Sequence, residues 1–291
     1  MKLCTFERGG TLRAGVVQDD AVVDLSVAAP DLPRDAVALL AAGPSALERA
    51  KTAAVSARDR LPLASLWLRP PILRPPKFLG IGLNYADHAA ESGQKPPAFP
   101  IVFNKQSTCV TGPRDPVHMP RVSSALDYEG ELGFVVGRRC RHVPRTRAHE
   151  VIAGYLVVND VSVRDWQLRT PTMTMGKSFD THGPLGPWLT TPDEVGDPHG
   201  LRLRTWVNGE LRQDSTTKQL IFDCFALVEH LSTAFTLEPG DVVATGTPGG
   251  VGIALKPPHL LRVGDVVRVE IEGLGALENE IVAEPETTSI P

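Results

Sequence analysis

The chain has 291 residues, a net charge of −4 at pH 7 and 42% hydrophobic residues. This is enough for a proper core in one large domain, or in one large and one small domain. The charge balance gives no basic field for nucleic acid, and no apolar stretch approaches the ~20 residues of a membrane helix. The sequence therefore predicts a protein that binds neither nucleic acid nor membranes.

The cysteines and the N-terminus predict a cytoplasmic location. The four cysteines are widely scattered and form no Cys-x-x-Cys pair, as is typical of reduced thiols in the cytosol. The first residues, Met1 to Arg8, contain no continuous apolar segment of the kind that a secretory signal has.

Residues 1–68 are predicted to form a small, separate α/β domain. Alternating apolar residues between glycine and aspartate turns indicate three strands, and helical spacing then indicates two helices. These elements are expected at Leu3–Phe6, Arg13–Val17, Ala21–Leu25, Ala36–Ala42 and Ser45–Ala57. Ser45 is a candidate N-cap for the last helix. The proline-punctuated residues 69–76 are predicted to be an extended linker, which leaves 77–291 as the main domain.

The main domain is predicted to contain many short strands and few helices, which defines a β-rich α+β fold. Strands are expected at Lys77–Ile81, Leu126–Val136, Tyr155–Val158 and Val242–Thr245, and through Val267, Val269 and Ile271. Helices are expected over Tyr85–Glu91 with Asn84 as a cap, from Thr146 to near Gly154, and over Lys218–Ala234. Three prolines in Gln94–Pro100 predict a loop.

The segment Asp127-Tyr128-Glu129-Gly130-Glu131 holds the first candidate site. A strand directs residues i and i+2 to one face, which places the Glu129 and Glu131 carboxylates side by side, roughly 6–7 Å apart at Cα. Asp160, after the apolar run 155–158, can add a third oxygen. Three carboxylates without thiolate or imidazole favour Mg²⁺ or Mn²⁺ over Zn²⁺. The alternative is an exposed strand face with ordinary acids.

Two further features are candidates for catalysis and substrate binding. His88 and Glu91 are three residues apart, so on a helix they share a face, and the carboxylate can raise the basicity of the imidazole to form a general base for water. The alternative is an exposed surface pair. Thr247 lies among glycines that allow close approach to a ligand, and its hydroxyl can hold a substrate carboxylate; the alternative is a plain tight turn.

Three familiar motifs are incomplete. Gly80 and Gly82 lack the third glycine of a dinucleotide-binding fingerprint, and Pro171 occupies the position of the first glycine in a phosphate-binding loop that would end at Gly176-Lys177-Ser178. There is no Gly-x-Ser-x-Gly elbow and no His-Glu-x-x-His motif. These gaps argue against a serine-triad hydrolase, a P-loop ATPase and a zinc protease.

Five segments, in order, resemble the fumarylacetoacetate hydrolase family over about Pro76 to Glu284. They are Ile81–Glu91, Asp127–Leu132, Asn159–Gln167, Gly176–Thr181 and Thr245–Gly252. The resemblance implies a mixed β-sandwich roll, a homodimer, a divalent metal and a substrate that is a small 2-oxo acid. Residues 1–68 resemble the N-terminal extension of longer members.

The resemblance also implies roles for three more residues. Lys177 matches the active-site lysine near the substrate oxygens, where its charge would stabilise a developing enolate. Arg164 and Gln167 resemble the positions that hold the metal-site acids and the substrate oxygens. For Arg164, a structural salt bridge is the alternative.

Three hypotheses for the function follow. The first is a metal-dependent hydrolase that cleaves a C–C bond of a β-diketo acid, such as an acylpyruvate or fumarylpyruvate, through a metal-bound enolate, with His88 and Glu91 activating water. The second keeps the site but decarboxylates oxaloacetate, or isomerises or hydrates a related 2-oxo acid. The third is a binding protein on a silent fold, against which the intact site residues argue. Because few anchors flank the helix 85–91, it is expected to be a mobile lid.

Overall fold

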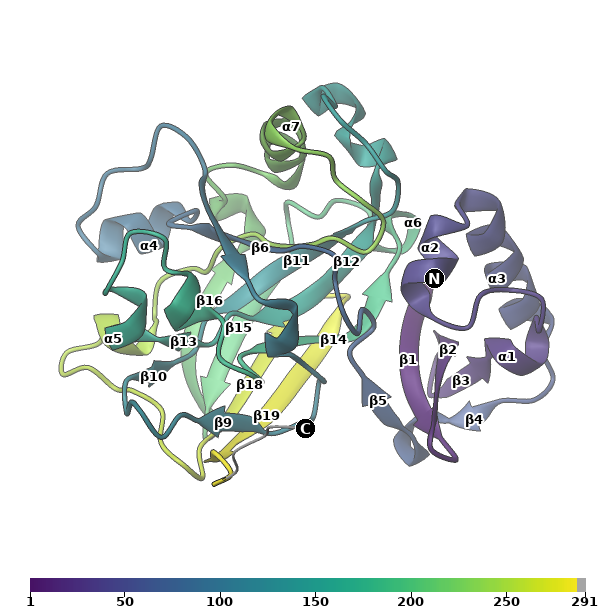
Figure 1. Cartoon of the computed structure of the whole chain (residues 1–291), viewed down its shortest axis with the longest axis horizontal. Helices are drawn as coiled ribbons and strands as arrows, with labels where there is room; N and C mark the ends of the chain where they lie inside the picture. Colours follow the sequence, from purple (N-terminus) through teal and green to yellow (C-terminus); the bar gives the residue numbers. More distant parts are fainter. Residues whose placement is uncertain (287–291) are drawn as a thin grey trace.

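Two β-sheets that pack against each other form the centre of the protein (Figure 1). The structure is a computed structural model that describes residues 1–286. The larger sheet contains β1 (Lys2–Arg8), β2 (Thr11–Gln18), β3 (Ala21–Asp24), β4 (Leu61–Pro62), β5 (Trp67–Arg69), β6 (Phe78–Gly82), β7 (Ile101–Lys105), β8 (Val110–Thr111), β11 (Gly130–Val136), β12 (Ile152–Asn159), β14 (Gly183–Thr190) and β17 (Val242–Ala244). Its main path runs β4-β3-β2-β1-β14-β12-β11-β17-β6-β7.

The second sheet has five strands in the order β16-β15-β18-β19-β9. Their bounds are β9 (Val117–Met119), β15 (Arg202–Val207), β16 (Glu210–Thr216), β18 (Val266–Ile271) and β19 (Gly275–Ala283), and β10 (Leu126–Asp127) pairs separately with β13 (Ser162–Val163). Among the described residues the α-helices are α1 (Leu25–Ala28), α2 (Ala36–Ala41), α3 (Pro44–Ser56), α4 (Ala86–Glu91), α5 (Arg164–Gln167), α6 (Pro192–Val195) and α7 (Cys224–Ala234). Short 3₁₀ turns cover η1 (Leu63–Ser65), η2 (Ser107–Cys109), η3 (Arg145–Glu150), η4 (Thr174–Lys177), η5 (Thr217–Gln219) and η6 (Gly252–Ala254). The prediction of a β-rich α+β fold is confirmed.

The central strands are buried on both faces. Leu132 and Phe134 of β11 belong to a core shared with Leu203 of β15 and other residues of the second sheet. Val135, which points to the opposite face, belongs to a second core shared with Leu39 of α2. A strand covered on both sides must be apolar at nearly every position, which is why β11 and β12 are almost continuous apolar runs.

The N-terminal segment continues the large sheet. Strand β2 pairs with one edge of β1 along its whole length. The other edge of β1 pairs first with β14, Lys2 opposite Thr190 and Leu3 opposite Leu189, and then with β5. The N-terminal ammonium group donates to Thr191 Oγ1 at 2.7 Å. The division into residues 1–68, a linker and 77–291 stays a prediction, and residues 287–291 of the last part lie outside the described residues.

The two helix N-caps predicted from the sequence, Ser45 and Asn84, are wrong. Helix α3 begins at Pro44 with Gly43 as its N-cap, because glycine adopts the required φ of 86° and proline suits the first helical position. Tyr85, without a side-chain cap, precedes α4. The Asn84 amide is buried instead and binds the backbone of Phe222 and Thr245.

Two predicted helices are shorter than expected. The chain after Thr146 forms only the 3₁₀ turn η3, because the apolar residues from Ile152 onward pair with β11 as β12. The helix predicted from Lys218 begins at Cys224, where the Asp223 side chain accepts from Ala226 N as an N-cap. Tertiary pairing overrides local helical spacing in both places.

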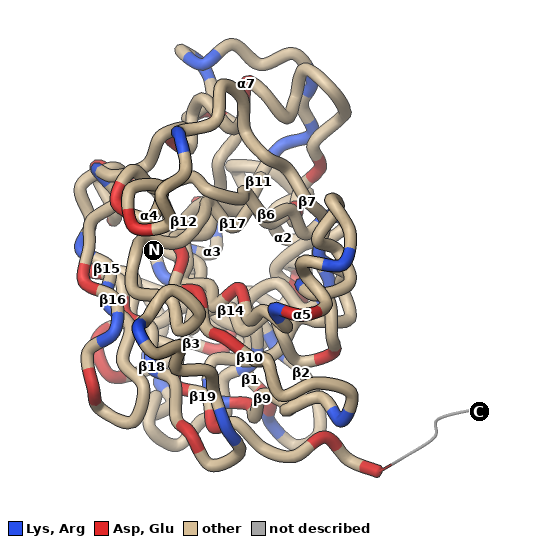
Figure 2. The backbone as a smooth tube through the Cα atoms, turned by 90° about the vertical axis from the view of Figure 1, so that its left-hand side faces the viewer, with Lys and Arg blue, Asp and Glu red and all other residues tan. Residues whose placement is uncertain are grey.

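The molecular surface carries charges of both signs. Figure 2 shows lysine and arginine interspersed with aspartate and glutamate along the backbone in that view. Within residues 1–286, no helix combines the length and the apolar character that a membrane crossing requires.

Candidate active site

The pairing of β11 with β12 brings three acids together. Gly130 pairs with Asn159, and Asp160 N donates to Glu129 O at 2.8 Å, so the end of one strand is fixed to the start of the other. Carboxylate oxygens of Glu129, Glu131 and Asp160 lie within 4.8 Å of one another. All three side chains are buried. The local reason is the i, i+2 spacing on one strand and a third acid just after its neighbour.

The residue between the two glutamates has to be glycine. A Cβ on Gly130 would lie 2.3 Å from Thr205 Oγ1 and 3.0 Å from a methyl of Val269, both on the second sheet. The second sheet therefore packs so closely against the backbone between the two acids that it leaves no room for a side chain there.

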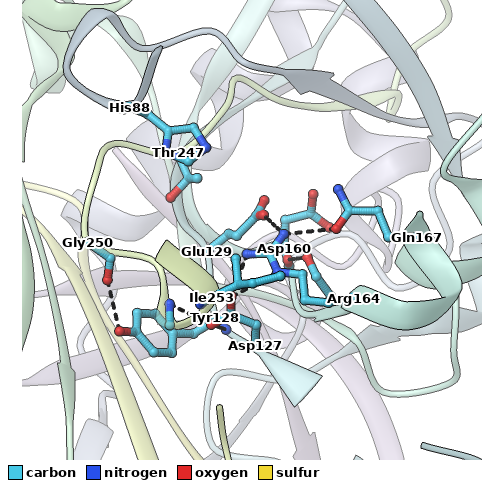
Figure 3. A network of polar contacts seen from close by, with 12 residues as sticks. His88, Asp127, Tyr128, Glu129, Asp160, Arg164, Gln167, Thr247, Gly250 and Ile253 are labelled. Atoms are coloured by element: carbon cyan, nitrogen blue, oxygen red, sulfur yellow. Dashed lines mark hydrogen bonds and ion pairs between the residues drawn. The ribbon is translucent and has the colours of Figure 1, made fainter. Parts of the chain in front are cut away.

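Two cations contact the Glu129 carboxylate, and Figure 3 shows one of them, Arg164. Lys177 Nζ donates to Glu129 Oε2 at 2.7 Å and to Asp160 Oδ2 at 2.8 Å. Arg164 donates to the other Glu129 oxygen at 2.5 Å and through Nε to Asp127 Oδ2 at 2.8 Å. The structural salt bridge that was the alternative for Arg164 is thus present. Its guanidinium group thereby orients the Glu129 carboxylate.

Burial and neighbouring charges separate the pKa values of the two glutamates. Burial alone would raise the pKa of Glu129, but Lys177 and Arg164 outweigh it and lower this pKa to about 2. Burial, reinforced by Asp160 and Glu129, raises the pKa of the Glu131 carboxyl well above its usual range. The side-chain cations nearby therefore stabilise the ionised form of Glu129 more than that of Glu131.

A divalent cation would stabilise the ionised form of Glu131. The donors are three carboxylates, with no thiolate or imidazole among them, which suits a hard ion such as Mg²⁺ or Mn²⁺. Glu131 Oε2 also accepts from Gly246 N at 2.7 Å, which leaves its other oxygen without a hydrogen bond within residues 1–286. Glu129, Glu131 and Asp160 are thus the residues that fit a metal.

His88 and Glu91 face each other on α4. His88 Nδ1 lies 3.4 Å from Glu91 Oε2, and both carboxylate oxygens of Glu91 accept from Gly250 N at 3.0 and 3.1 Å. Gly250 has a φ of 97°, and a Cβ there would lie 2.1 Å from Arg212 O, so only glycine can present this N–H. The carboxylate is fixed, and it in turn orients the imidazole.

Helix α4 is better anchored than the sequence suggested. Asn84, just before it, makes three hydrogen bonds to Phe222 and Thr245, and Asp87 accepts from Ser215 Oγ on β16. The expectation that few anchors flank this helix is wrong, because its partners are more than 100 residues away in the sequence.

Most of the predicted residues line one cavity of about 310 Å³. Seven of the nine do so: His88, Glu129, Glu131, Arg164, Gln167, Lys177 and Thr247. Apolar walls come from Ile81, Ile101, Phe103 and Met173 among others. Glu91 and Asp160 do not line the cavity. They lie behind His88 and Lys177, the residues that they contact.

The Thr247 hydroxyl is already engaged within the protein. It donates to Gly130 O at 2.9 Å and accepts from Gln213 Nε2 at 2.8 Å. Its one proton is used, so it can only accept from a ligand. Gln167 Oε1 accepts from Arg164 at 2.9 Å, which orients the amide beside the cavity.

The sequence analysis missed Lys105, Asp127 and Gln213. Lys105 is fully buried at the end of β7 and donates to Asp160 Oδ1 at 2.6 Å, to His182 O at 3.0 Å and to Lys177 O. A lone lysine after an apolar strand gives no signal of this, because its partners are 55 to 77 residues away. Asp127 belongs to the same segment as the two glutamates, so that segment could have pointed to it.

Comparisons with known proteins found related sequences and structures. A family model described as fumarylacetoacetate (FAA) hydrolase C-terminal matches residues 77–282. The mitochondrial oxaloacetate tautomerase of Xenopus laevis is 44% identical over 288 residues, covering 97% of this chain and 90% of the relative.

Solved structures match over nearly the whole chain. A fumarylacetoacetate hydrolase from Exiguobacterium antarcticum has a TM-score of 0.86 at 36% identity, covering 98% of this chain and 100% of that one. A maleylpyruvate hydrolase from Sphingobium sp. SYK-6, solved with manganese(II) and pyruvate, has a TM-score of 0.83 at 32% identity with the same coverage.

Replacing Glu131 by alanine is expected to weaken Mn²⁺ binding, because one of three carboxylate ligands is lost. The loss should exceed the roughly 10–100-fold that is typical when a residue that only supports a metal ligand is removed. Titration calorimetry on the purified variant measures this. Glu280→Ala, which removes an exposed acid of β19, is the matched control. Equal affinities in both variants would contradict the assignment.

Lys105→Met is expected to destabilise the fold by about 3–5 kcal/mol, since it leaves one oxygen of the buried Asp160 carboxylate and two backbone carbonyls without a charged donor. Urea unfolding of the metal-free protein measures the change. The surface pair of Lys51 with Asp193 gives the control, and Lys51→Met should change the midpoint little. A similar shift in both variants would refute a special role for Lys105.

Proposed function

The chain belongs to the fumarylacetoacetate hydrolase family, and on that premise we propose that it is a divalent-metal-dependent hydrolase that cleaves a C–C bond of a β-diketo acid such as an acylpyruvate. One observation carries the proposal. The His88 imidazole, backed by Glu91, lines the same cavity of about 310 Å³ as Lys177 and the acid pair. The imidazole that would deprotonate water and the ammonium group that would stabilise an enolate thus line the same cavity.

His88 is the proposed general base. Because its Nδ1 faces Glu91, its Nε2 is the nitrogen left for a water molecule in the cavity. The imidazole takes a proton from that water as the oxygen attacks the distal carbonyl carbon of the substrate. The C–C bond then breaks towards the 2-oxo acid, and the imidazolium returns the proton to the resulting enolate. The products are pyruvate and a carboxylic acid.

Lys177 is the proposed electrostatic stabiliser. Burial lowers the pKa of its ammonium group, but Asp160 and Glu129 outweigh burial and raise it, so the group carries its charge at neutral pH. It binds the acid cluster with two of its three donors, which leaves one for a substrate oxygen in the cavity. An ion held by Glu129, Glu131 and Asp160 would supply Lewis acidity for the carboxylate and 2-oxo group.

Keto–enol tautomerisation of oxaloacetate is the second candidate. It is supported by the 44% identity with the Xenopus laevis tautomerase over almost the whole chain. The same residues suit it, since His88 can move a proton at the carbon between the two carbonyl groups and Lys177 can stabilise the enolate. The two reactions differ in whether water attacks a carbonyl.

His88→Ala is expected to reduce hydrolysis of acetylpyruvate by roughly 10²–10⁴-fold, because the general base for water is lost. Oxaloacetate decarboxylation needs no water attack and should fall less. Parallel assays with Mg²⁺, with and without EDTA, on both substrates measure this, and His149→Ala on the surface is the control.

The outcomes separate the candidates. If the wild-type protein tautomerises oxaloacetate but leaves acetylpyruvate intact, the second candidate replaces the first. If metal binding persists in His88→Ala and both activities are untouched, the proposed mechanism is wrong.

We further propose a homodimer in the cytoplasm, as the family resemblance and the cysteine pattern suggest. Light scattering at micromolar concentration should report about twice the mass of the 31.3 kDa chain. A monomer at all concentrations tested would refute the dimer.

A further inference from the structure

We infer that strand β16 braces the candidate active site through two positioning residues, Gln213 and Ser215. They lie two positions apart on the strand and so point to the same side of it. Gln213 connects the acid pair to the turn that contains Gly246 and Thr247, called the Thr247 turn below. Ser215 connects the same strand to α4, the helix that contains His88. The Ser215 part rests on the function proposed above, whereas the Gln213 part rests only on the acid cluster.

Gln213 is fully buried, and every polar atom of its amide has a partner. Its Oε1 accepts from Gly130 N at 3.0 Å, and its Nε2 donates to Thr247 Oγ1 at 2.8 Å and to Pro248 O at 3.0 Å. The reverse orientation of the amide would place NH₂ against an N–H and an oxygen against a carbonyl. The partners therefore fix one orientation of this side chain.

These contacts close a ring around Gly130. Its N–H donates to Gln213, Gln213 donates to Thr247, and Thr247 donates back to the Gly130 carbonyl at 2.9 Å. Gly130 is the residue between Glu129 and Glu131. The backbone N–H and carbonyl of the residue that joins the two acids are thus held by β16 and the Thr247 turn.

The same turn holds the second acid directly. Gly246 N donates to Glu131 Oε2 at 2.7 Å, one residue before Thr247. If Gln213 releases the turn, it releases the Gly246 N–H and the Gly130 backbone together. The positions of both carboxylates then become free to vary, and a metal site depends on such fixed positions.

Ser215 acts on the other part of the site. Its hydroxyl donates to Asp87 Oδ2, and Asp87 Oδ1 accepts from His88 N at 2.7 Å. The link runs from β16 through Asp87 to the backbone of the proposed base. Since Ser215 makes no hydrogen bond to the three acids, all of which lie within the described residues, its loss should move the imidazole and leave the metal site intact.

Gln213→Met tests the first contact, since methionine keeps the length of glutamine but offers no N–H donor and only a weak sulfur acceptor. The expected result is a 10–100-fold loss of Mn²⁺ affinity in a calorimetric titration of the metal-free protein. Asn279→Leu is the matched control, because Asn279 is an equally buried amide that binds Gly112 O and Asp115 O away from the cavity. It should lose thermal stability but keep its Mn²⁺ affinity.

A second variant keeps the test decisive if Gln213→Met does not fold. Thr247→Val has the same shape as threonine and breaks the same ring at another bond. It should also lower Mn²⁺ affinity, a readout that needs no substrate. If the folded variant binds Mn²⁺ like Asn279→Leu, the brace is refuted.

Ser215→Ala tests the second contact. Mn²⁺ affinity and KM should stay near the wild-type values, while kcat for acetylpyruvate falls about tenfold or more because the base is misplaced. Ser26→Ala, which removes a serine–aspartate bond in the N-terminal segment, should change none of these. An unchanged kcat in Ser215→Ala would refute the positioning role of Ser215. If the wild-type protein is inactive on every 2-oxo acid tested, the proposed function is refuted, but the Mn²⁺ result for Gln213 still stands.

Discussion

The structure depends on one constraint, which is that three carboxylates are buried within 4.8 Å of one another. Buried like charges at this distance repel strongly, and the fold must compensate for the repulsion. It does so with Lys177 and Lys105 on Asp160 and with Lys177 and Arg164 on Glu129. Glu131 has only a backbone N–H, so it is the acid with the greatest need for a further cation.

Strand pairing sets the position of this cluster. The pairing of β11 with β12 aligns Glu131 beside Val158 and so places Asp160 next to Glu129. The second sheet comes so close that only glycine fits between the two glutamates. The backbone between the two ligands is therefore packed against the second sheet, and this favours fixed ligand positions.

The proposed base comes from outside these strands. Helix α4 contributes His88, and contacts from Phe222, Thr245, Ser215 and Gly250 hold the helix and its glutamate in place. This division separates the group that would hold a metal from the group that would move a proton. Members of one family can thus keep the enolate-forming half of the site and vary the half that handles water.

The sequence by itself determined the fold class and the candidate site residues, of which Lys177, Arg164 and Gln167 came only from the family resemblance. The i, i+2 acids, the third acid after a buried strand and the His88–Glu91 spacing all follow from local periodicity, which a single chain displays. Only the tertiary structure decided which residues hold these side chains in place. Lys105, Gln213 and Asn84 contact residues 34 to 161 positions away, and the helix predicted after Thr146 gave way to β12 because pairing with β11 outweighed local spacing. Local patterns specify which side chains a strand or helix presents, but a hydrogen bond between distant segments depends on how those segments pack.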